Sequence, residues 1–181
     1  MALVPARQLP SWSRKVTRDA SISARRMGEN DLEYVLRWRN HPDIRRFMLS
    51  QHEITPAEHR AWFDRASRDE TRALLVIEEY GRPLGCVIFS GVKKDATADW
   101  SFYSAPGSPA GSGTRICATA LDFAFSDLCL HKVAGQVLDF NRASIRIHQR
   151  LGFTQEGNLR EHNLINGTYH DLFCFGVLSI E

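Results

Sequence analysis

The clearest chemical signal in this sequence is a glycine-rich loop between an expected strand and an expected helix. Gly111, Ser112 and Gly113 close a Pro- and Gly-rich stretch, and a helix is expected from Thr114. Glycines let the backbone approach a ligand, and the first amides of a helix offer N–H groups to an anion. Arg115 adds a positive charge there. The loop lacks the signatures of an ATP, GTP or dinucleotide site, so it predicts another anionic ligand or a flexible connector.

A second segment, residues 141–153, begins where a strand ends and finishes where a new strand opens. It contains Asn141, Ser144, His148 and Arg150 and closes on Gly-Phe. Asn141 can cap the helix that follows it. An imidazole titrates near neutrality and can donate or accept a proton, so His148 is a candidate for acid–base chemistry. The alternative is a histidine that packs within the helix.

Local signals predict the elements that position these residues. Thr55, Pro56 and Glu58 form a capping box at a helix start, and Asn166-Gly167 is a typical hairpin turn. Strands are expected at 21–27, 73–79, 84–92, 98–104, 132–138, 153–164 and 168–178, and helices after Asn30, after Thr55, from Thr114 to about Cys129, and from Asn141 to Arg150. The strand–helix alternation in the middle of the chain requires a mixed sheet covered by helices. The fold class is therefore α/β.

The composition excludes several classes of protein. The chain has 181 residues, of which 43% are hydrophobic and 24% charged, so it is neither disordered nor a membrane bundle. A net charge of +2 is too small to predict nucleic-acid binding. Four cysteines without a Cys-x-x-Cys spacing indicate a reducing compartment, and we expect a cytoplasmic protein. Residues 1–20 lack the apolar core of a secretory signal, so they are expected to be a flexible leader before one domain at 21–181.

Together, the glycine-rich loop and the 141–153 segment resemble the GNAT acetyltransferase superfamily. The resemblance implies a single domain with a mixed, mostly antiparallel sheet of about seven strands and helices on both faces, and acetyl-CoA as cosubstrate without a metal. The implied acetyl-CoA contacts are Phe102, Tyr103, Ser104, Ala110, Gly111, Ser112, Gly113, Thr114, Arg115, Asn141, Ser144, His148 and Arg150. In the family, Gln or Arg usually stands three residues before the first glycine; here that residue is Ser108, so the phosphate contact is expected either to be weaker or to come from Arg115.

The amino-terminal part resembles the N-acetyltransferases of pseudaminic acid biosynthesis. The similarity lies in residues 36–45, which include Trp-Arg-Asn-His-Pro, followed by His59 and Trp62. It implies a UDP-linked amino sugar as the small-molecule acceptor, UDP-4-amino-4,6-dideoxy-N-acetyl-β-L-altrosamine, acetylated on its 4-amino group. Arg39, His59, Trp62 and Tyr103 match the positions that hold the nucleotide end. A homodimer is an open alternative to a monomer, and no membrane or nucleic-acid partner is expected.

The resemblance also implies how the reaction is catalysed. Backbone N–H groups near residues 102–104 would stabilise the developing negative charge on the thioester oxygen. Asn141 and His148 stand at the catalytic positions, and His148 replaces the tyrosine that commonly protonates the departing thiolate. Some members carry a glutamate base on the fifth strand, where this chain has Gln136, which cannot take a proton. Either a water relay ends at another base, with Asp99 and Asp139 as candidates, or the sugar amine binds already neutral.

Three further interpretations stay open from sequence. His162, His170 and Asp171 could converge on the last hairpin, because a two-residue turn at 166–167 would pair residue 162 with residue 171, although we expect no metal there. The acceptor could instead be a protein N-terminus, as in RimJ- and RimL-like ribosomal-protein acetyltransferases. A non-catalytic acyl-CoA-binding regulator would fit the replacements at Gln136 and Ser108.

Overall fold

The computed structural model describes residues 21–181, so the leader predicted at 1–20 lies outside the described residues. Within this range the strands are β1 (Ile22–Arg26), β2 (Arg72–Glu79), β3 (Arg82–Ser90), β4 (Thr97–Ser104), β5 (Lys132–Leu138), β6 (Thr154–Ile165) and β7 (Thr168–Leu178). They form one seven-stranded sheet in the order β1-β2-β3-β4-β5-β7-β6. Neighbouring strands are antiparallel except β4 and β5, which are parallel. The predicted α/β class and the mixed, mostly antiparallel sheet are confirmed.

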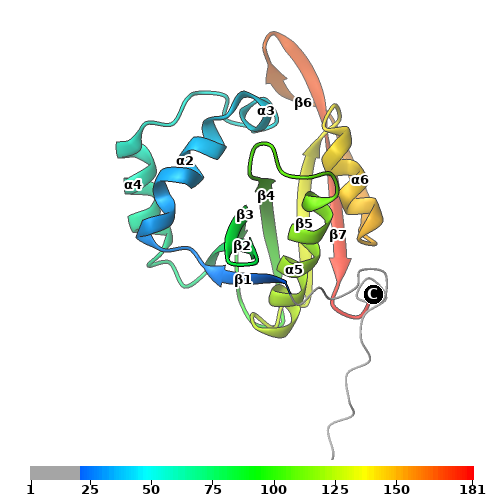
Figure 1. Ribbon diagram of the computed structural model, residues 1–181. Helices are drawn as coiled ribbons and strands as arrows, with labels where there is room; N and C mark the ends of the chain where they lie inside the picture. Colours follow the sequence, from blue (N-terminus) through cyan, green and yellow to red (C-terminus); the bar gives the residue numbers. More distant parts are fainter. Residues whose placement is uncertain (1–20) are drawn as a thin grey trace, which may run out of the picture.

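Helices cover both faces of this sheet (Figure 1). The helical elements over residues 21–181 are η1 (Glu29–Asp31), α2 (Leu32–Asn40), α3 (Pro42–Arg45), α4 (Pro56–Ala66), α5 (Ser112–Ser126) and α6 (Arg142–Arg150). The larger core joins α5 and α6 to one face of the sheet, whereas α2 and α4 pack on the other face over Leu74, Val76 and Cys86. None of the helices between residues 21 and 181 combines the length and apolar character needed to cross a bilayer.

Most predicted boundaries hold where a local signal fixes them. Thr55 and Glu58 form the expected capping box, with the Glu58 amide donating to Thr55 Oγ1 at 3.2 Å and the Thr55 amide donating to Glu58 Oε2 at 2.7 Å. Asn166 and Gly167 both have positive φ, as the predicted turn requires.

Two predicted helix starts are displaced, and one short helix was not predicted. Asn30 does not cap α2: it lies within the short 3-10 helix η1, and α2 starts after Asp31. Pro42 begins the unpredicted helix α3 directly after α2 ends, because proline suits a first helical position. The helix expected from Thr114 begins at Ser112, immediately after Gly111 in the left-handed conformation (φ 88°).

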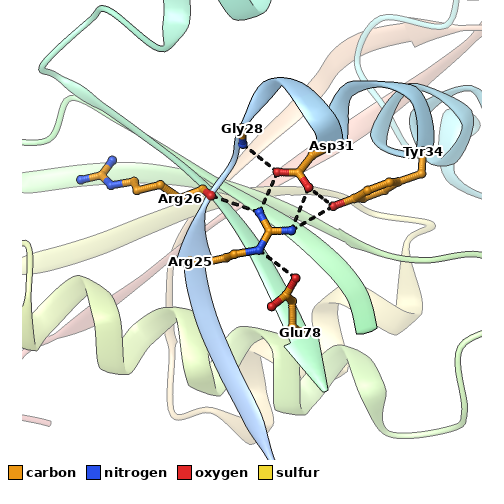
Figure 2. A network of polar contacts seen from close by, with 6 residues as sticks. All are labelled: Arg25, Arg26, Gly28, Asp31, Tyr34 and Glu78. Atoms are coloured by element: carbon orange, nitrogen blue, oxygen red, sulfur yellow. Dashed lines mark hydrogen bonds and ion pairs between the residues drawn. The ribbon is translucent and has the colours of Figure 1, made fainter. Parts of the chain in front are cut away.

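A partly buried network of polar contacts fixes the start of α2 against the sheet (Figure 2). Arg25 on β1 donates to both carboxylate oxygens of Asp31 at 2.7 and 2.8 Å and to Glu78 of β2 at 2.7 Å. The Gly28 amide and the Tyr34 hydroxyl also donate to Asp31. Burial raises the pKa of Asp31, but these hydrogen bonds outweigh it and bring the pKa down to about 2. The network anchors the helix that carries Arg39.

Candidate active site

The site is centred on a gap between β4 and β5. The two strands pair only from Thr97–Lys132 to Asp99–Ala134 and then separate. Because side chains alternate along a strand, Trp100 and Phe102 lie on the face of β4 toward α6, while Asp99, Ser101 and Tyr103 lie on the face toward α2 and α4. Contacts agree with this division: Trp100 belongs to the core with α5, and Tyr103 packs on the core with α2.

A cavity of about 320 Å³, here called the loop cavity, lies beside the glycine-rich loop. Of the residues predicted to contact acetyl-CoA, it is lined by Phe102, Tyr103, Ser104, Ser112, Gly113, Asn141 and Ser144. Ser112 is 1% exposed, and its hydroxyl has no hydrogen-bond partner within residues 21–181. This unsatisfied hydroxyl stands at the start of the 15-residue helix α5, where amides and helix dipole favour an anion. The residues present therefore fit a phosphate group.

Gly113 has a second role beside this cavity. A Cβ atom at Gly113 would lie 2.8 Å from the Ile147 side chain, so the glycine also lets α5 approach α6. Gly111, in contrast, has open space around it and is required by its positive φ. Any side chain at 113 would meet Ile147 directly, so a Gly113 variant reports on helix packing as well as on ligand binding.

Five predicted cofactor residues line none of the three cavities described here: Ala110, Gly111, Thr114, Arg115 and Arg150. Arg115 was expected to supply a phosphate contact, but its guanidinium pairs with Glu79 of β2. Arg150 is exposed at the last residue of α6, on the opposite end of the helix from Asn141. The expectation for Arg115 is therefore corrected, because a nearer carboxylate takes its charge.

A second cavity of about 380 Å³, the central cavity, occupies the gap itself. Five of its lining residues also line the loop cavity, among them Phe102, Asn141 and Ser144. Asn141 Oδ1 accepts from the Ser144 amide at 3.2 Å, which confirms the predicted cap and holds the start of α6 against the gap. The remaining lining residues are Phe47, Met48, Leu49, Asp99, Trp100, Ser101, Gly135, Gln136 and His148.

His148 lies at the inner end of the central cavity with both ring nitrogens engaged. Trp100 Nε1 can only donate, and it lies 3.1 Å from His148 Nε2, so that nitrogen accepts. Nδ1 then carries the proton and donates to the Ser144 carbonyl at 2.9 Å. Burial lowers the pKa of His148 to about 4. In this arrangement the neutral imidazole has no free proton to offer for the donor role expected from sequence.

A third cavity of about 190 Å³, the side cavity, lies between the sheet and helices α2 and α4. It brings together all four residues predicted to hold the nucleotide end of a substrate: Arg39, His59, Trp62 and Tyr103. The rings of His59 and Trp62 stack with centroids 5.1 Å apart and planes 25° apart. Burial lowers the pKa of His59, so its ring is neutral at pH 7.

Arg39 is incompletely paired in the side cavity. Its Nη2 donates to the Ser50 carbonyl at 3.0 Å, whereas the buried Nη1 has no hydrogen-bond partner in the described part of the chain. Burial lowers the pKa of Arg39, although a guanidinium stays charged. Burial raises the pKa of Tyr103 well above its usual value, so the neighbouring phenol is uncharged and does not neutralise Arg39.

The site also contains residues that sequence reasoning missed. Met48 lines all three cavities, from the segment between α3 and α4, and Ser101 lines the central and side cavities. Nothing in the local sequence marks Met48, because its place depends on how this segment folds back over β4. Trp100 could have been found from its position on the strand expected beside the ligand, two residues before Phe102.

Of the candidate bases and the hairpin residues, only Asp99 lines the central cavity. Asp99 and Gln136 line the central cavity, but Asp139 lies 3.1 Å from His170 and is outside it. The predicted pairing of residue 162 with residue 171 is wrong, because the β6–β7 register shifts between Leu159 and Asn163. Over residues 21–181, no group of three or more His, Cys, Asp or Glu side chains is arranged to hold a metal ion.

Comparisons with known proteins show which family and which fold the chain resembles. A family model for the acetyltransferase (GNAT) domain matches residues 22–154. The SPbeta prophage-derived N-acetyltransferase YokL of Bacillus subtilis is 31% identical over 144 residues, covering 77% of this chain and 80% of the relative. Acetyltransferase PseH of Campylobacter jejuni is 23% identical over 128 residues, covering 71% of this chain and 80% of the relative. Spermidine N-acetyltransferase from Vibrio cholerae, crystallised with CoA and spermine, shares the fold with a TM-score of 0.82 at 22% identity, covering 89% of this chain and 97% of that one.

Proposed function

Because this chain belongs to the GNAT acetyltransferase family, we propose that it moves the acetyl group of acetyl-CoA to an amine carried by a nucleotide sugar. The specific acceptor we propose is the UDP-linked 4-amino sugar implied by the resemblance to the pseudaminic acid enzymes. Membership of the family makes the chain an acetyl-CoA-dependent N-acetyltransferase. The acceptor rests on one observation above the others, the unsatisfied guanidinium of Arg39.

A buried donor without a partner is costly unless a ligand supplies the missing acceptor. The Nη1 atom of Arg39 is buried and unpartnered within residues 21–181, in a cavity whose lining contains no Asp or Glu. A guanidinium binds phosphate or carboxylate oxygens through charge-assisted hydrogen bonds. The stacked pair of His59 and Trp62 beside it offers flat surfaces to a planar base. Together these groups suit a nucleoside diphosphate.

The same cavity disfavours a polyamine acceptor. Two like charges about 4 Å apart repel by about 1 kcal/mol in bulk water and by about 4 kcal/mol at an effective dielectric constant of 20. An ammonium in the side cavity would face the Arg39 charge without a lining carboxylate to offset it. Spermidine is the acceptor named for the Vibrio cholerae structure, and that name describes that protein alone.

The cofactor half of the proposal rests on the loop cavity and the gap. Ser112 and the first amides of α5 would hold the pyrophosphate, and residues 102–104 would lie along the thiol-bearing arm. Acetyl-CoA supplies an acyl group on a good leaving group. The amine must lose a proton as it is acetylated, and Asp99 is the carboxylate in the central cavity that can accept it.

Arg39→Gln tests the acceptor directly. Thiol release from acetyl-CoA would be measured with the UDP-amino sugar, with spermidine and with an N-terminal peptide. We expect the wild type to prefer the sugar and Arg39→Gln to raise its KM by on the order of tenfold or more, without changing acetyl-CoA affinity. Arg37→Gln is the matched control, because Arg37 is a well-exposed residue of the same helix. Faster turnover of spermidine or the peptide than of the sugar would contradict the proposal.

A further inference from the structure

The inner end of the central cavity is a wall of three rings. Trp100 and Phe102 have centroids 5.0 Å apart, and Phe102 lies 5.7 Å from His148. Trp100 is 6% exposed and His148 is 2% exposed, so both meet the cavity over a small area of their surface. A ligand arm that enters beside Ser112 and follows β4 inward ends against this wall, because Phe102 lines both cavities.

The indole of Trp100 is fixed by a hydrogen bond and by packing. It donates to His148 Nε2, and His148 is oriented in turn by its bond to the Ser144 carbonyl. Phe153 stacks on Trp100 with centroids 5.1 Å apart, and Phe175 stacks on His148 at 4.9 Å. A second layer of rings therefore packs behind Trp100 and His148 and leaves these side chains little room to move.

Gly135 on β5 makes this arrangement sterically feasible. A Cβ atom there would lie 2.6 Å from Trp100 Nε1 and 2.8 Å from His148 Nε2. Any other residue would push against the two atoms that form the hydrogen bond. The glycine, the indole and the imidazole thus form one packed unit across β4, β5 and α6.

We propose that Trp100, held in place by His148, limits the transferred acyl group to acetyl. The inference rests on the proposed function for its acyl-CoA substrate. An acyl chain longer than acetyl would have to displace an indole that is hydrogen-bonded on its edge and stacked on its face. Trp100 is then a specificity-determining residue, and His148 is a positioning residue that acts through it.

The test compares acetyl-CoA with butyryl-CoA in two measurements, calorimetric binding and turnover with the acceptor amine. One methylene in a tight apolar pocket typically changes specificity by about 10- to 200-fold. Trp100→Ala should raise the ratio of butyryl to acetyl kcat/KM by on the order of tenfold or more, and should tighten butyryl-CoA binding relative to acetyl-CoA. Phe63→Leu is the control, since it truncates a buried ring in the opposite core.

Two variants of His148 separate positioning from simple packing. His148→Phe keeps a ring but leaves the Trp100 N–H without an acceptor, so selectivity for acetyl should relax. His148→Gln restores an acceptor near the position of Nε2, so selectivity should return toward that of the wild type. A purely structural histidine would give the same selectivity in both variants at matched thermal stability.

The possible outcomes separate the selectivity role of Trp100 and His148 from the proposed acetyltransferase function. A folded Trp100→Ala variant that rejects butyryl-CoA as strongly as the wild type overturns the role of Trp100. Equal selectivity in His148→Phe and His148→Gln overturns the role of His148. A wild type that binds no acyl-CoA overturns the proposed function, and this inference with it.

Discussion

Two residues of this site each bury a polar atom without satisfying it in the described chain, Nη1 of Arg39 and the hydroxyl of Ser112. Such groups lower the stability of the unliganded protein, because their hydrogen bonds with water are lost and not replaced. They lie in different cavities, on opposite sides of the gap between β4 and β5. Each is therefore poised to gain a bond when an anionic ligand arrives.

Asp99 is the proposed proton acceptor in the central cavity. If its carboxylate takes the proton from the acceptor amine, Asp99→Asn should lower kcat by about 10²- to 10⁴-fold and leave acetyl-CoA binding unchanged. The rate of the variant should climb with pH, because the amine then loses its proton to solvent. Steady-state kinetics from pH 6 to 9 would measure this.

Asp95→Asn is the matched control for that experiment. Asp95 lies four residues earlier, is exposed, and lines none of the three cavities. A folded Asp99→Asn enzyme with a wild-type rate and pH profile would remove Asp99 from the reaction and leave deprotonation to solvent.

At the scale of the elements, the position of α2 depends on the Asp31 network, which ties the start of this helix to β1 and β2 (Figure 2). The same helix carries Arg39. The pKa of Asp31 in the folded protein is about 2, below its usual 3.8. A lowered pKa contributes stability above the usual value, and this contribution is lost as pH falls toward 2.

Asp31→Asn should therefore destabilise the protein at pH 7 and flatten its acid unfolding. The pKa difference corresponds to about 2 kcal/mol of unfolding free energy, at about 1.4 kcal/mol per pKa unit. Urea unfolding of wild type and variant between pH 7 and 3 would measure both effects. Asp64→Asn, on the exposed side of α4, is the control. Parallel pH profiles for wild type and Asp31→Asn would contradict the assignment.

The elements also show which features the sequence could predict. The capping box at Thr55 and the turn at Asn166-Gly167 are encoded by adjacent residues, and both were predicted correctly. The helix α3 was missed because it has only four residues, and its first residue, Pro42, is as typical of a helix break as of a helix start. The fates of Arg115 and His148 depend on Glu79 and Trp100, which lie 36 and 48 residues away in the chain. Local patterns contain no information on such partners.

At the scale of the whole molecule, the two layers of helices have separate tasks. The layer of α5 and α6 borders the loop cavity, and the layer of α2 and α4 borders the side cavity. The two regions meet at the gap in the sheet, where Met48 lines all three cavities. Substrates that bind on opposite faces would thus meet at the gap within the sheet.

Ligand binding should stabilise this molecule as a whole. Acetyl-CoA at 100 times its Kd adds about 2.7 kcal/mol to the free energy of unfolding. For a chain of this size, that corresponds to a rise in Tm of about 5–10 °C. Thermal unfolding with and without acetyl-CoA would measure the shift.

Two variants sharpen that experiment. Ser112→Ala should reduce the shift without lowering the Tm of the free protein, because it removes an unsatisfied buried hydroxyl. Arg150→Gln should leave the shift unchanged, since Arg150 is exposed and lies outside the cavities. A reduced shift in Arg150→Gln alone would restore Arg150 as a cofactor residue and contradict the site described here.

The parting of β4 from β5 has a further consequence for how the protein avoids aggregation. Beyond Asp99, the side of β4 that faces β5 has no strand partner within residues 21–181, so the sheet has an edge in its own middle. Open edges at the periphery invite other chains to add a strand. This one lies between two strands of its own sheet, where a second protein chain is hard to fit. The unpaired backbone groups of β4 would instead be available to the amide groups of a narrow ligand arm, if acetyl-CoA binds as proposed.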